Sequence, residues 1–221
     1  MRVILILFSL VFSIMTFAEG DVQKTAFQEG EHYTTLDSPV KTSDPSKIEV
    51  TEVFWYGCPH CYKFEPLINR WKATLGDDVN FVASPAMWPT RRPGLPENWM
   101  EIHARAFYSA KALGVLPKLH DPLFRALSVD RKLLKSAAEV AEIFVANGVE
   151  KDKFMKVYNS FGVSSQIKQA DARAKGYRIT GTPEMVVEGK YRISARMAGG
   201  QAQMLEVASF LIDKVRAERN L

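Results

Sequence analysis

The stretch FWYGCPHCYKFEP, residues 54–66, decides how the rest of the chain is interpreted, because it holds both cysteines of the protein, Cys58 and Cys61. It begins within a run of β-branched and aromatic residues, 48–56, which is typical of a buried strand. Gly57 ends this run, and the proline after Cys58 suits the first turn of a helix, where its missing N–H group does no harm. The pattern predicts a strand, a turn and a helix that starts at Cys58.

Two cysteines that are separated by two residues and lie at the start of a helix are typical of a redox-active site. The first N–H groups of a helix have no partner within it and its dipole is positive there, so the Cys58 thiolate is stabilised and its pKa falls. His60 adds positive charge or a donor close by. Cys61 lies one turn further on and can attack a mixed disulfide held on Cys58. We expect Cys58 to be the nucleophile and Cys61 the resolving cysteine, with Pro59 and His60 completing the catalytic motif.

Three other interpretations of the cysteine pair are weaker. Zinc usually needs four ligands, whereas the chain has two cysteines, four histidines and no second cysteine pair, so we expect no metal. A structural disulfide would close only a tiny loop and add little stability. A thiol peroxidase can act with one reactive cysteine. That interpretation therefore does not explain why two cysteines lie together at a helix start.

The first residues indicate export. An apolar run, 3–15, follows Arg2, and Thr16 and Ala18 are the small residues expected before a cleavage site. The run is shorter than the roughly 18–20 residues that span a bilayer. We expect a signal peptide, 1–18, cleaved after Ala18, and a periplasmic protein; an uncleaved anchor is the alternative. The net charge of +4 comes from scattered basic residues, which predicts no nucleic-acid binding.

The pattern along the chain predicts an α/β fold in which a mixed central sheet, flanked by helices, is interrupted by a helical block. We divide the chain into a first sheet-forming part, 19–84, a helical insertion, 85–175, and a second sheet-forming part, 176–221. The expected strands are 32–36, 48–56, 79–84, 184–188 and 190–194. The expected helices are one from Cys58 to Lys72, then 98–113, 133–147, 150–160, 164–175 and 204–216.

With these elements in place, the chain resembles the DsbA family of thioredoxin-fold disulfide oxidoreductases over nearly its whole mature length. The most specific match is the motif 58–61, CPHC, followed by Tyr62 and by Phe64-Glu65. The resemblance implies a thioredoxin fold with an inserted helical domain, and a low-pKa, oxidising dithiol that needs no other cofactor. It also implies reduced or unfolded exported proteins as substrates, and a quinone-linked membrane protein of the DsbB type as the reoxidising partner.

The resemblance assigns three further residues. Pro183 matches the cis proline that faces the active-site disulfide in this family and, with Thr182, shapes the surface where a substrate strand can pair. Glu52 matches a buried acid beneath the active site, which can help to move the proton that Cys61 releases or takes up. The best-known members carry valine where this chain has Thr182, and threonine is commoner there in isomerases and reductases.

The sequence therefore predicts an exported enzyme that donates its Cys58–Cys61 disulfide to newly exported proteins. A disulfide isomerase or reductase using the same dithiol is the alternative that Thr182 favours, and a non-catalytic, chaperone-like binder of exported chains is a second. A monomer is favoured, because only about 30 residues precede the first strand. Five residues are candidates for an apolar groove for unfolded chains, namely Trp55, Tyr56, Tyr62, Met87 and Trp88. Packing in the core is the alternative, and the sequence does not decide which face Trp55 and Tyr56 occupy.

Overall fold

A computed structural model describes residues 27–220, so the predicted signal peptide, 1–18, lies outside the described residues. The strands are β1 (Thr34–Thr35), β2 (Ile48–Phe54), β3 (Val79–Pro85), β4 (Glu184–Val187) and β5 (Tyr191–Ser194). They form one sheet in the order β1-β5-β4-β2-β3. β2 and β3 run parallel, and the other pairs are antiparallel. The predicted mixed sheet, with its parallel pair linked through a helix, is confirmed.

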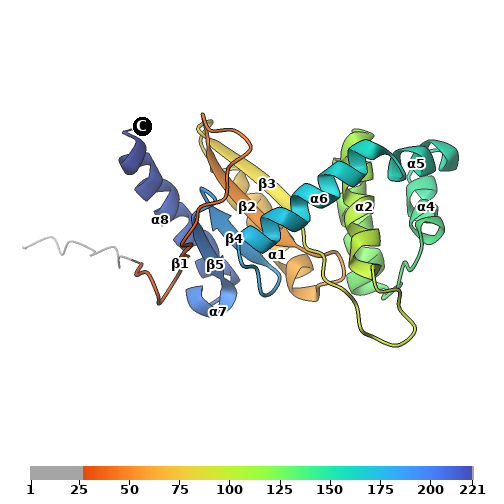
Figure 1. Cartoon of the computed structure of the whole chain (residues 1–221), viewed down its shortest axis with the longest axis horizontal. Helices are drawn as coiled ribbons and strands as arrows, with labels where there is room; N and C mark the ends of the chain where they lie inside the picture. Colours follow the sequence, from red (N-terminus) through yellow and green to blue (C-terminus); the bar gives the residue numbers. More distant parts are fainter. Residues whose placement is uncertain (1–26, 221) are drawn as a thin grey trace, which may run out of the picture.

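Within the described residues the helices fall into a sheet-covering set and a separate group. The sheet-covering helices are α1 (Pro59–Lys72), α6 (Phe161–Gly176), α7 (Ala195–Ala198) and α8 (Gln201–Arg219). The others are α2 (Trp99–Ala112), α3 (Leu116–Phe124), a π-helix η1 (Arg125–Val129), α4 (Ala137–Ala146) and α5 (Lys151–Tyr158). Figure 1 shows α2, α4 and α5 at one end of the molecule and α6 running from them to the sheet.

The two faces of the sheet are covered differently. On one face, Val50 of β2 belongs to the same core cluster as Phe64 of α1 and Leu211 of α8. On the other face, Val53 of β2 packs in a cluster with Tyr177, which directly follows α6. The alternation of side chains along β2 explains this division, since neighbouring residues of a strand point to opposite faces. The helices therefore lie on both sides of the sheet, as the sequence predicts.

Strand β2 lies inside the sheet and leads directly into the cysteine motif, so it fixes the position of that motif. All seven residues of β2 are buried, as expected for a strand paired on both edges. The strand ends at Phe54, so Trp55 and Tyr56 belong to the turn rather than to the predicted strand 48–56. Cys58 is the N-cap of α1 and Pro59 occupies its first turn, as predicted.

Two elements of the helical group escaped prediction. α3 was not predicted because it contains two prolines, at 117 and 122, and prolines usually indicate a loop. Pro117 lies in the first turn of the helix, where a proline is tolerated. The π-helix that follows has no simple sequence period. The short helix α7 was not predicted either; its N-cap Ser194 accepts a hydrogen bond from the Met197 backbone N–H at 3.4 Å.

Three predicted helix starts are wrong, and one of them is that of the predicted helix 204–216, which begins at 201. The predicted helix 133–147 begins only at Ala137, because Ser136 caps it by accepting a hydrogen bond from the Glu139 backbone N–H at 3.2 Å. The buried Leu134 before it has a left-handed φ of +44°, which helix geometry excludes. The predicted helix 164–175 instead begins at 161, after the cap Ser160. No observation tests the division at 84/85 and 175/176, which stays a prediction.

The packing of α1 on the sheet gives a stability prediction. Ile68 of α1 is fully buried in the cluster that contains Val50, so Ile68→Ala leaves a cavity and is expected to lower the free energy of unfolding by about 2–5 kcal/mol. Urea unfolding of the purified protein measures this. The exposed Arg70 on the same helix provides the control, and Arg70→Ala is expected to change the free energy by under about 0.5 kcal/mol. Equal effects of the two substitutions would contradict this packing.

Candidate active site

The two cysteines lie at the start of α1 as free thiols, as the dithiol form requires. The backbone N–H of Cys58 donates to the Trp55 carbonyl at 2.9 Å, which closes the turn between β2 and α1. Cys58 is 7% exposed and Cys61 is fully buried. The Cys58 thiol donates to the backbone carbonyl of Thr182 at 3.3 Å, so the loop before β4 lies directly against the reactive sulfur.

The surroundings shift the two thiols in opposite directions. The pKa of Cys58 falls to about 5, chiefly through a hydrogen bond with the Cys61 side chain, then through Thr182 and the backbone amides of Cys61 and His60, while burial opposes the shift. The pKa of Cys61 rises well above its ordinary value because it is buried and because it is hydrogen-bonded to Cys58 and close to its charge. This asymmetry supports Cys58 as the nucleophile and Cys61 as the protonated partner.

The side chain of His60 is exposed, in contrast to the cysteines on either side of it. Its effect on the pKa of Cys58 comes from its backbone N–H group. Its carbonyl accepts a hydrogen bond of 2.6 Å from Gln201 of α8, which fastens the first turn of α1. The backbone of His60 therefore contributes at the helix start, and a role for its imidazole stays a prediction.

The loop opposite the dithiol contains the predicted proline. The peptide bond between Thr182 and Pro183 is cis, as expected. Pro183 is buried and is followed directly by β4, while Thr182 is half-buried beside Cys58. The Thr182 side chain lowers the pKa of Cys58 through a hydrogen bond, an effect that valine could not supply.

Glu52 lies beneath the active site, on the face of β2 that α1 covers. It is 2% exposed, and its Oε1 atom has no hydrogen-bond partner. Burial raises its pKa to about 8; the charge of Glu65 adds to the shift and Lys72 opposes it. The carboxyl group is therefore protonated near neutral pH. The charge of Cys58 also raises the pKa of Glu52, and the charge of Glu52 raises the pKa of Cys61.

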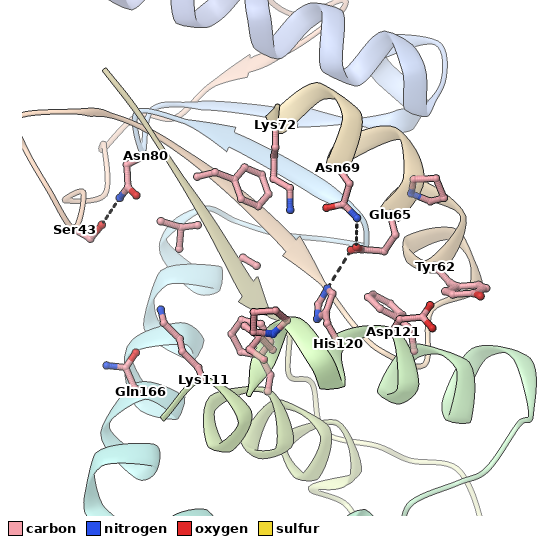
Figure 2. A pocket seen from close by; sticks show the side chains of 18 of the residues that line it. Ser43, Tyr62, Glu65, Asn69, Lys72, Asn80, Lys111, His120, Asp121 and Gln166 are labelled. Atoms are coloured by element: carbon pink, nitrogen blue, oxygen red, sulfur yellow. Dashed lines mark hydrogen bonds and ion pairs between the residues drawn. The ribbon is translucent and has the colours of Figure 1, made fainter. Parts of the chain in front are cut away.

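A second polar network links the helical group to α1. The Tyr56 hydroxyl is hydrogen-bonded to Nδ1 of His120 at 2.8 Å, and Nε2 of His120 lies 3.3 Å from Oε1 of Glu65. Asn69 donates to the other Glu65 oxygen at 3.2 Å. Figure 2 shows Asn69, Glu65 and His120 joined along one wall of a groove of about 1060 Å³. Sequence reasoning missed His120, since the helix that holds it was not predicted.

Another buried histidine, His103, fixes the aromatic residue before the active-site turn. Its Nδ1 accepts a hydrogen bond from Trp55 Nε1 at 3.0 Å, and its Nε2 lies 3.1 Å from the Leu134 carbonyl. Burial lowers the pKa of His103 to about 4, so it is neutral at ordinary pH. The two histidines, His103 and His120, both come from the helical group and both hold residues of the turn before Cys58.

The predicted groove of five apolar residues is not a single surface. Tyr56 is 1% exposed and packs edge-on against Phe124, so it belongs to the core. Tyr62 lines the groove of Figure 2, whereas Met87 and Trp88 line a separate hollow beside α6. The prediction failed because the turn after β2 directs Tyr56 inward. Across residues 27–220, no three His, Cys, Asp or Glu side chains are grouped as metal ligands.

The comparisons with known proteins agree with this site. A family profile described as a DSBA-like thioredoxin domain matches residues 68–211. The thiol:disulfide interchange protein DsbA of Azotobacter vinelandii is 42% identical over 207 residues, covering 94% of this chain and 92% of that protein. The one from Pseudomonas aeruginosa is 42% identical over 195 residues, covering 88% and 89%.

Solved structures give the same result. The crystal structure of Pseudomonas aeruginosa DsbA matches with a TM-score of 0.78 and 40% identity, covering 88% of this chain and 97% of that one. The oxidoreductase DsbA from Xylella fastidiosa matches with a TM-score of 0.77 and 28% identity, covering 87% and 99%. The chain belongs to the DSBA-like thioredoxin family. It is a thiol:disulfide oxidoreductase with the thioredoxin fold.

The low pKa of Cys58 predicts a pH dependence of stability. The thiol has a pKa of about 5 in the folded dithiol protein and an ordinary value of 9.0 when unfolded. Because the folded value is the lower one, the thiolate contributes no stability below about pH 5 and a growing amount up to pH 9. Denaturant unfolding of the dithiol protein and of Cys58→Ser, over this pH range, measures the difference. A constant difference would show that Cys58 ionises normally.

The raised pKa of Glu52 predicts the opposite trend. Between its ordinary value of 4.5 and about 8, the unfolded chain releases the proton that the folded protein retains, so the wild type loses stability as pH rises. Glu52→Gln cannot titrate. The variant is therefore expected to gain stability relative to the wild type across this window and to show no trend below it. A parallel pH profile for the two proteins would mean that Glu52 is charged in the fold.

Proposed function

We propose that this enzyme oxidises reduced polypeptides after their export by donating its Cys58–Cys61 disulfide. A substrate thiolate attacks the Cys58 sulfur, the disulfide breaks, and Cys61 leaves and takes up a proton. A second substrate thiolate then attacks the substrate sulfur of the mixed disulfide, and the Cys58 thiolate leaves. The substrate loses two electrons, which the enzyme keeps as one thiolate and one thiol, and the second proton goes to solvent.

The observation that carries this proposal is the opposite ionisation of the two sulfurs. A stabilised Cys58 thiolate favours the dithiol over the disulfide, which makes the disulfide an oxidant, and it is a good leaving group from the mixed disulfide. Cys61 is a poor thiolate and needs a proton when it leaves. We propose that the protonated, buried Glu52 exchanges that proton with Cys61.

The character of Thr182 also supports an oxidase. From the sequence alone, threonine before the cis proline suggests an isomerase or reductase. In the structure, its side chain lowers the pKa of Cys58, so it favours the dithiol and makes the disulfide more oxidising. A reductase would need the reverse balance, and the chaperone-like alternative would need no reactive sulfur. An isomerase would also act through a stabilised Cys58 thiolate, so the pKa of Cys58 argues against the reductase and not against the isomerase.

We further propose that the enzyme acts in the periplasm as a monomer and uses its own disulfide in place of a bound cofactor. The redox-active pair carries both electrons, so a membrane protein of the DsbB type, linked to quinone, would restore the disulfide. The relatives named DsbA support this assignment. Among the described residues, no helix is long and apolar enough to cross a bilayer.

Equilibration of the mature protein in glutathione buffers tests the direction of electron flow. We expect the Cys58–Cys61 pair to persist as a dithiol in strongly oxidising mixtures, because the thiolate is stabilised. Thr182→Val removes one hydrogen bond to that thiolate, and the equilibrium is expected to shift roughly tenfold toward the disulfide. Separation of thiol-alkylated forms measures the populations.

Two variants complete the test. Cys61→Ser is expected to accumulate a mixed disulfide on Cys58 with a reduced substrate protein, and Cys58→Ser is expected to abolish oxidation. A disulfide that survives until the buffer is strongly reducing would make the protein a reductant. Oxidation of substrates by Cys58→Ser would favour the chaperone-like alternative instead.

A further inference from the structure

Two buried glutamate side chains lie on opposite faces of the sheet near the dithiol. In the β2–β4 register Glu52 is paired with Met185, and Val53 is paired with Glu184. Residues paired across neighbouring strands share a face. Glu52 therefore lies under α1, and Glu184 lies on the face of Val53, beneath the loop that leads into β4. The exchange mechanism above uses Glu52 and gives Glu184 no role.

Glu184 is the centre of a compact set of hydrogen bonds. Its Oε1 atom accepts from the backbone N–H of Thr180 at 3.2 Å and from the Thr180 hydroxyl at 3.0 Å. Burial raises the pKa of Glu184, and the hydrogen bonds from Thr180, the charge of Arg192 and the backbone of Gly181 oppose that shift. Glu184 is 3% exposed, and Nε of Arg192 lies 3.8 Å from its Oε2 atom. The carboxylate thus fixes the start of the loop 180–183 through its hydrogen bonds with Thr180.

This loop is the one that contacts the reactive sulfur. Gly181 is followed by Thr182, whose carbonyl accepts from the Cys58 thiol at 3.3 Å. The other three residues of β4 are apolar, and the partner of Glu184 in β2 is Val53, so packing alone would favour an apolar side chain here. A buried carboxylate is costly unless it is hydrogen-bonded. The hydrogen bonds that Glu184 accepts through Oε1 come from the loop, whereas its buried Oε2 atom has no hydrogen-bond partner among the described residues.

We propose that Glu184 is a positioning residue for the exchange reaction: its buried carboxylate holds the loop 180–183 in the place where Thr182 contacts the Cys58 sulfur. Glu184 touches neither sulfur nor substrate and acts through Thr182. The same loop is the surface expected to meet a substrate strand beside the cysteines, so Glu184 also sets the position of that surface.

The test measures the ionisation of Cys58 in the full mature protein. Glu184→Leu keeps the size of the side chain and removes the acceptor, and Glu184→Gln retains an oxygen that can accept from Thr180. We expect Glu184→Leu to raise the pKa of Cys58 by about one unit, because the Thr182 side chain, whose hydrogen bond lowers that pKa, is no longer held in place. Glu184→Gln is expected to stay near the wild type. The ultraviolet absorbance of the thiolate during titration gives the value.

Glu188 provides a matched control, because it directly follows the last residue of β4, at the opposite end of the strand from Glu184. It is half-buried and paired with Arg219, whereas the hydrogen bonds of Glu184 go to Thr180 of the loop. Glu188→Leu removes a comparable ion pair and is expected to leave the Cys58 titration unchanged. The glutathione equilibrium of Glu184→Leu should shift roughly tenfold toward the disulfide, in step with the pKa.

A double-mutant cycle tests the route through Thr182. Thr182→Val and Glu184→Leu should have less than additive effects on the pKa of Cys58, because both remove the same contact. If Glu184→Leu does not fold, Thr180→Val removes one donor from an exposed residue and should shift the pKa in the same direction. A wild-type pKa in the folded loop variant overturns the proposal. The titration does not depend on which way the enzyme passes electrons, so this result leaves the oxidase assignment intact.

Discussion

A negative charge on the Cys58 sulfur is the constraint around which this protein is organised. Cys58 is only 7% exposed, so water cannot be the main support of this charge. Its support comes from the Cys61 side chain, from Thr182 and from the first amides of α1. Each of these lies on a different stretch of chain or depends on the helix start. The sheet brings them together, because β2 leads into α1 and its neighbour β4 follows the loop that holds Thr182.

The helical group contributes to the site at a distance from the sulfurs. His103 holds Trp55 and His120 holds Tyr56, and these two residues form the turn between β2 and the motif. Both contacts join segments that are about fifty or more residues apart in the sequence. The insertion therefore shapes the turn that places Cys58, besides covering it, which explains why a thioredoxin-like sheet can carry a large helical group without losing the geometry of its dithiol.

The sequence predicted local features well and long-range ones poorly. The strand, turn and helix around Cys58 follow from side-chain type and from the proline in the first turn, and the structure confirms them. The helix with His120 contains two prolines and has no clear period, so neither the helix nor its link to Glu65 could be predicted. Glu184 was placed in a strand, but only the folded loop reveals its partners.

Cys58 is also the N-cap residue of α1, a position usually filled by serine, threonine or aspartate. As a thiol it makes no side-chain capping hydrogen bond, whereas the charged sulfur is stabilised by the amides of His60 and Cys61. Ionised cysteine thus performs the task of an aspartate at a helix start. Loss of this anion when the disulfide forms leaves the helix uncapped. Electron transfer and loss of the helix cap are therefore one event, because a disulfide sulfur carries no charge for these amides to stabilise.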